Sequence, residues 1–192
     1  MIKKVIKILL SLATIIAIII VYLSFFGIST KQFNNVIKSE ILDINKTVNL
    51  ELNSVKFKLN PSNFSINATT FEPDIFVNSS KLELEYIKTN VSIKSFINQN
   101  FSIDDLEIST KKNKLNDLIL LARAFKNTPE LFILNNVIKE GFLVADIKLN
   151  FDNNGKIKND YEINGFIKNG KIDILRKYFI KDLNLIFNIK DK

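Results

Sequence analysis

Residues Leu143 to Phe151 read LVADIKLNF, and this stretch decides the class of fold. Its odd-numbered residues are all apolar, and from Asp146 onward the residues between them are polar. Apolar and polar residues that alternate with a period of two predict a β-strand with one apolar face and one solvated face. The apolar side of this strand consists of Leu143, Ala145, Ile147, Leu149 and Phe151.

The same alternation returns twice on the C-terminal side of this strand. Residues 156–168 place Tyr161, Ile163 and Ile167 on one side, and residues 183–189 carry apolar residues at every second position. The sequence DNNG at 152–155 predicts the first connecting turn, and Asn169-Gly170 predicts a tight hairpin. Three neighbouring strands would then share one apolar face. Its predicted members are Leu143, Ala145, Ile147, Leu149, Phe151, Ile163, Ile167, Leu183, Leu185 and Phe187, with Ile189 extending it.

Alternating runs also fill the chain on the N-terminal side. They begin at Val48 and include a set formed by Leu82, Leu84 and Tyr86. The phase slips at Asn53-Ser54, which predicts a bulge or a tight bend, and Asn60-Pro61 predicts a turn. Strands with one apolar and one polar face are typical of an antiparallel sheet that is covered on one side only.

Three segments change to a period of 3.6 and predict helices near 31–44, 115–126 and 129–139. The sequence Thr128-Pro129-Glu130 is typical of an N-cap followed by the first two helical residues. Gly141 is expected to end the third helix. The fold class is therefore mainly β with a few helices, built as a curved antiparallel sheet with an apolar inner face.

The N-terminus predicts a membrane anchor. Lys3, Lys4 and Lys7 precede an apolar segment from Ile8 to Phe26, which as a helix spans about 28 Å, close to a bilayer core of roughly 30 Å. We expect one helix over 5–27 with its N-terminus in the cytoplasm. The membrane-facing positions named from the sequence are Ile8, Leu12, Ile16, Ile20 and Phe26.

A cleaved signal peptide is the alternative to this anchor. Its apolar region would cover about 7–15 residues and end at small residues. Bulky Phe25 and Phe26 stand at that point, and Gly27 with Ser29 would form only a weak site. The interpretation adopted is a basic tip and transmembrane anchor over 1–30 and an exported domain over 31–192. Because no closing element follows the last strand, we expect the sequence to be the start of a longer protein.

Composition excludes several functional classes. The chain has no His and no Cys, and its 5 Gly form no phosphate-binding pattern, so we expect no enzyme, no metal site and no cofactor. The net charge of +7 comprises +3 from residues 1–30 and +4 from the rest, where Lys is interleaved with acids. We therefore expect no nucleic-acid partner. Glu83 and Glu85 are interpreted as solvated strand surface, and residues 152–155 as a turn, because Gly stands at the fourth position and not the sixth position of a calcium loop.

Residues 82–108 carry a resemblance to a known family. The order is a strand LELEYI at 82–87, then VSIKSFI at 91–97, then FSIDDLEI at 101–108. With the basic N-terminus, the membrane helix and the segment from Glu130 to Phe151, this order resembles the N-terminal region of AsmA-like proteins, the group of TamB-type and YhdP-type proteins. The chain departs from the family at Gln99-Asn100, where Gly is common, and at Ser109-Thr110, where Pro is common.

The resemblance implies an inner-membrane-anchored periplasmic protein of a Gram-negative bacterium, with a role in outer-membrane biogenesis and phospholipid transport. It further implies that the apolar inner face is a groove for phospholipid acyl chains. A second interpretation stays open, in which the face closes into a sealed core and the chain is an anchored adaptor for an envelope protein. The alternation of residues does not separate an open groove from a sealed core.

Overall fold

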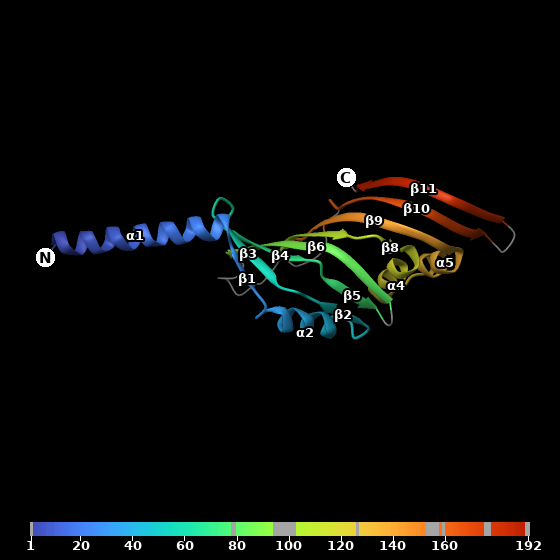
Figure 1. Ribbon diagram of the computed structural model, residues 1–192, viewed down its shortest axis with the longest axis horizontal. Coiled ribbons are helices and arrows are strands. Elements are labelled where there is room, and N and C mark those ends of the chain that lie inside the picture. The colour runs from blue at the N-terminus through green and yellow to red at the C-terminus, as the bar shows by residue number, and fades with distance from the viewer. Residues whose placement is uncertain are drawn as a thin grey trace.

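The chain folds as one long helix attached to a curved antiparallel sheet (Figure 1). This computed structural model describes residues 2–77, 80–93, 103–125, 127–152, 158, 160–174 and 178–190. The prediction of a mainly β fold with a few helices, an N-terminal apolar helix and an antiparallel sheet is confirmed.

Helix α1 (Ile2–Phe25) projects away from the sheet. Its segment Lys3–Phe25 is long and apolar enough to span a membrane, and its apolar window is not buried against the described chain. The side chains of the named positions in α1 are exposed, as a lipid-facing helix requires. Phe26 lies just beyond the helix, and the expected helical end at residue 27 is corrected to Phe25.

The turn after α1 requires glycine. Gly27 has φ +70°, a left-handed conformation that L side chains rarely adopt. A Cβ at this position would stand 2.3 Å from the carbonyl oxygen of Phe57. The chain therefore passes from helix to sheet within two residues, and Ile28–Thr30, which the sequence assigned to the anchor, form strand β1 of the sheet.

Every strand pair in the sheet is antiparallel. The main path runs β1-β3-β4-β6-β7-β9-β10-β11, and β2, β5 and β8 lie off it. The bounds are β2 Val48–Glu51, β3 Val55–Asn60, β4 Ser65–Phe71, β5 Asp74–Val77, β6 Ser80–Ser92, β7 Ile103–Thr110, β8 Asn113–Lys114, β9 Ile138–Asn150, β10 Glu162–Ile174 and β11 Tyr178–Lys190.

The three predicted helices after the anchor are present as α2 (Asn34–Ile44), α4 (Leu115–Phe125) and α5 (Pro129–Val137). Thr128 is the N-cap of α5, and its hydroxyl accepts a hydrogen bond from the N–H of Leu131, as the sequence predicted. The expected bend at Asn53-Ser54 is also present, because it separates β2 from β3.

Two glycine predictions are wrong. Gly141 does not end α5, which stops at Val137; it lies inside β9 with φ +133°, packed against the side chain of Leu115 and the backbone of Gly170. Asn169-Gly170 does not form a hairpin but a register irregularity inside β10, with Asn169 at φ 54°. The long strand continues through this bulge because β9 and β11 pair with it on both sides. The turn expected at 153–155 lies outside the described residues.

The prediction that Tyr86 shares a face with Leu82 and Leu84 is also wrong. The register shifts between Leu84 and Tyr86, so β6 changes phase there. Leu84 lies opposite Thr110, whereas Tyr86 lies opposite Ser109. Ser109 and Thr110 are neighbours on β7 and point to opposite sides of the sheet, so Leu84 and Tyr86 do so as well. After the shift, Ile87 and not Tyr86 continues the apolar face begun by Leu82 and Leu84.

The fully buried core is small and lies where β2, β5 and the start of β6 meet α4. Val48, Val77 and Leu82 form its centre, and Leu118 and Leu121 of α4 pack against them. The chain exposes 13723 Å² of surface, against about 9,300 Å² for a compact monomer of 22.0 kDa. The projecting helix α1 and the open sheet both contribute to this excess.

Candidate functional site

The strand registers align one row of side chains across the sheet that is apolar except at Thr70. Ile147 of β9 lies opposite Ile163 of β10 and opposite Ile108 of β7. Residues directly opposite each other in an antiparallel pair point to the same side. Followed from β3 to β11, the row consists of Val55, Thr70, Ile87, Ile108, Ile147, Ile163 and Ile189.

Parallel rows on the same side complete what we call the inner face. The nearest row starts at the membrane helix and consists of Ile28, Phe57, Ala68, Thr89, Leu106 and Leu149. Two shorter rows cross β9, β10 and β11: Ala145, Gly165 and Phe187, then Leu143, Ile167 and Leu185. Helix α4 packs on this side, because Leu115 contacts Gly141, which shares a face with Leu143.

The structure thus brings the sequence-predicted residues of β9, β10 and β11 together on one face. Two of them lie at its margins. Leu183 lies opposite Gly170 at the β10–β11 irregularity. Phe151 lies just beyond β9, and its N–H donates to the carbonyl of Asp104 at 3.0 Å.

The inner face is neither bare surface nor sealed core. Ala145 is 3% exposed, yet Leu185 and Ile189 are each 47% exposed, and Ile147 and Ile163 are intermediate. Burial therefore falls from the sheet centre toward the β11 edge. An apolar face that is half covered can accept an apolar chain without unfolding the protein.

The two sides of the sheet differ sharply in charge. Lys88, Glu107 and Lys148 lie opposite one another on β6, β7 and β9, one position along from the isoleucine row. Lys88 Nζ is 3.0 Å and Lys148 Nζ is 3.9 Å from Glu107 carboxylate oxygens. Over β6, β7 and β9 this outer face is a ladder of ion pairs in water, so at these strands the inner face is the side suited to apolar ligands.

The ladder continues to the edge strand. Glu162 accepts a hydrogen bond from Asn164 and pairs with Lys190 at 2.9 Å, and these two contacts hold the pKa of Glu162 below its ordinary value. Elsewhere Lys111 lies 2.7 Å from Glu72, and this contact lowers the pKa of Glu72 and raises that of Lys111. These are surface ion pairs.

Glu83, which was interpreted from the sequence as solvated strand surface, also lies in such a pair. Lys81 contacts Asp74 at 3.0 Å and Glu83 at 3.3 Å, and both contacts raise the pKa of Lys81. Across the described part of the chain, no group of three or more acidic residues is placed to hold a metal ion.

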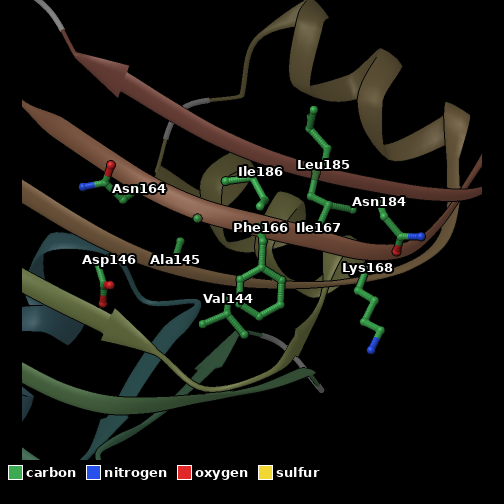
Figure 2. A pocket seen from close by; sticks show the side chains of 11 residues that line it. Val144, Ala145, Asp146, Asn164, Phe166, Ile167, Lys168, Asn184, Leu185 and Ile186 are labelled. Atoms are coloured by element: carbon green, nitrogen blue, oxygen red, sulfur yellow. The ribbon is translucent and has the colours of Figure 1, made fainter.

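A hollow of about 590 Å³, which was not predicted from the sequence, lies on the outer face. Val144, Phe166 and Ile186 lie opposite one another there, and Figure 2 shows the Phe166 ring beside Val144. Asp146 and Lys168 stand at its polar margin. The sequence does contain a signal for this hollow. Val144 is an apolar residue on the otherwise polar side of LVADIKLNF, and Ile186 is an apolar residue on the otherwise polar side of β11.

Comparisons with protein-family models, with curated proteins and with solved structures found no match. The resemblance to AsmA-like proteins therefore rests on the strand pattern of residues 82–108 and on the segment from Glu130 to Phe151.

Proposed function

We propose that this protein is anchored in the inner membrane of a Gram-negative bacterium by α1 and holds or conducts phospholipid acyl chains along the inner face. The exported domain would lie in the periplasm and serve outer-membrane biogenesis. The observation that carries the proposal is that two adjacent rows cover the inner face: one starts at Ile28, three residues after the end of α1, and the other ends at Ile189 on the edge strand.

The dimensions suit this ligand. The row from Val55 to Ile189 crosses seven strands, which at about 4.8 Å per spacing makes roughly 29 Å. Half of a bilayer core, about 15 Å, holds one acyl chain, so a row is long enough for a whole chain. Each methylene group buried from water contributes about 0.8 kcal/mol, so the inner face would hold an acyl chain by apolar contact along its length.

A specific observation favours a second candidate function. Among the described strands, β11 pairs only with β10, and it exposes Tyr178, Phe179 and Ile186. A long edge strand with exposed apolar side chains is a template for strand addition. The adaptor hypothesis would use this edge to bind an envelope protein.

Photo-crosslinking tests the lipid proposal. A photoreactive residue in place of Ile147, in the full chain in membranes, should crosslink to phospholipid. A folded protein that yields only protein adducts at this position would overturn the proposal and favour the adaptor.

A further inference from the structure

We propose that the β3–β4 turn, residues 61–64, dips into the membrane interface beside α1 and forms the portal through which acyl chains reach the inner face. This inference rests on the proposed function and adds to it where the ligand enters. The partner of the turn is the lipid surface itself, and the residue that makes the contact is Phe64.

Strand direction places the turn at the membrane. Ile28 of β1 lies opposite Phe57 of β3, and the two strands are antiparallel. Since β1 leads away from α1, β3 runs back toward it. From Phe57 to Asn60 the strand advances about 10 Å in that direction.

The same distance measured along α1 gives the depth of the turn. Phe26 and Gly27 separate Ile28 from the helix, so an advance of about 10 Å past the level of Ile28 brings the turn to the level of the last turn of α1. Contacts between α1 and β3 agree with this placement, and Figure 1 shows the β3–β4 connection beside the C-terminal end of α1. If α1 spans the bilayer, the turn lies at the interface and not in bulk water.

The turn has the chemistry of an interfacial loop. Pro61, Ser62, Asn63 and Phe64 carry no charge, and the Phe64 side chain is 63% exposed. The backbone holds Phe64 at φ 49°, which is uncommon for a residue other than Gly, Asn or Asp, and its carbonyl accepts the N–H of Ile93 at 2.8 Å. An exposed aromatic ring fixed in this way suits the boundary between lipid and water.

An apolar path leads from this level onto the inner face. Phe26 stacks on Tyr22 of α1 with ring centroids 5.3 Å apart, and both Phe26 and Ile28 are exposed. Ile28 lies opposite Phe57, an inner-face position on β3, and Phe33 packs edge-on against Phe57 at 5.4 Å. A chain that leaves the bilayer beside α1 meets apolar side chains without crossing a charged row.

Tryptophan fluorescence can test the membrane contact of the turn, because the sequence contains no tryptophan. Because the chain has Trp 0, Phe64→Trp creates a single site-specific fluorophore. Phe71→Trp is the matched control, because Phe71 is 57% exposed and lies at the other end of β4, about 20 Å away. Both variants are prepared as the full chain in liposomes that contain phosphatidylcholine brominated near the headgroup.

The indole of the Phe64→Trp variant should emit at shorter wavelength than that of the control, and the brominated lipid should quench it at least twofold. The emission of the Phe71→Trp variant should be unchanged by the brominated lipid. Equal emission and equal quenching in the two variants would overturn the membrane contact.

A second substitution tests the portal. Phe64→Asp should reduce phospholipid crosslinking from position 147 severalfold at an unchanged midpoint of thermal unfolding. Crosslinking equal to that of the wild type would overturn the portal. If the wild type gave no crosslink at all while the Phe64→Trp variant was still quenched, the proposed function and its portal would fall, but the membrane contact of the turn would stand.

Discussion

The ring of Phe187 lies across Gly165, in the space that a side chain at residue 165 would fill. A Cβ at residue 165 would stand 2.7 Å from Phe187 Cζ and 2.6 Å from the carbonyl oxygen of Val144. Ala145, Gly165 and Phe187 form one row across β9, β10 and β11, so two small positions make room for one large ring on the edge strand. The inner face therefore stays apolar at this point because the ring covers the backbone of its neighbour.

Gly165→Ala should destabilise the sheet by about 1–3 kcal/mol, the range for overpacking. Chemical denaturation of the full chain in detergent measures the change. Gly165→Ala combined with Phe187→Leu should recover part of the loss, because the ring contact is relieved while the contact with the Val144 carbonyl remains. A single variant as stable as the wild type would show that Phe187 does not lie over Gly165.

Gly27→Ala should uncouple α1 from the sheet. The left-handed φ and the 2.3 Å approach to the Phe57 carbonyl leave no room for a methyl group, and a residue forced into such a conformation costs about 1–3 kcal/mol. Limited proteolysis should cut the variant between α1 and β3 much faster than the wild type. Ser24→Ala, which removes an exposed hydroxyl bonded to Ile20 in α1, is the control and should leave the cleavage rate unchanged.

Leu185→Lys and Ile186→Lys separate an open face from a sealed core. The two residues are neighbours on β11 that point to opposite sides, and they are 47% and 88% exposed. A lysine at either position can reach water, so each variant should stay within about 1 kcal/mol of the wild type. Only Leu185→Lys should reduce lipid crosslinking from position 147. Unfolding of Leu185→Lys alone would indicate a sealed core, because burying the charge would cost several kcal/mol.

Stability should fall at acid pH as the surface pairs lose their carboxylates. The pKa of Glu162 is lowered by Asn164 and Lys190, and that of Glu72 by Lys111, from a usual value of 4.5. A lowered folded-state pKa stabilises above the unfolded value and loses that contribution as pH falls through the folded value. The thermal midpoint should thus decline below about pH 4.5, and Glu162→Gln should show a smaller decline. An equal decline in the variant would mean that other groups set the acid sensitivity.

The anchor and its orientation are tested by topology. Carbonate washing should leave the protein in the membrane fraction, and a reporter active only in the periplasm should be active when fused after Lys192. The basis is the helix from Lys3 to Phe25 with basic residues at its N-terminal end. A mature protein whose N-terminus begins near Thr30 would show cleavage and contradict the anchor.

The periodicity of apolar residues predicted most strands and helices, because one face of each element packs against the protein and the other face is in water. The alternation in LVADIKLNF located β9, and the N-cap Thr128 located α5, since both signals are local. The pairing register of β10 depends on its neighbouring strands and not on its own sequence alone. Asn169-Gly170 has the composition of a hairpin, but pairing on both sides holds β10 together as one strand with a bulge.

The features missed in the sequence depend on contacts between distant segments. Gly141 was assigned to a helix end, but Leu115 and Gly170 pack against its backbone inside β9. Ile28–Thr30 continue the uncharged run that follows Lys7 and so were assigned to the anchor, although three pairs with β3 draw them into the sheet. The candidate face was predictable in its residues, and its partial exposure became visible only in the folded sheet.

Crosslinking from adjacent positions 147 and 148 tests the lipid-binding inner face most directly. Ile147 lies on the inner face opposite Ile163, and Lys148 lies on the outer face opposite Glu162, so one step along β9 changes the side of the sheet. With a photoreactive residue at each position in turn, in the full chain in membranes, the account predicts phospholipid adducts at 147 and none above background at 148. Equal lipid adducts at both positions, or none at 147 in a folded protein, would contradict it.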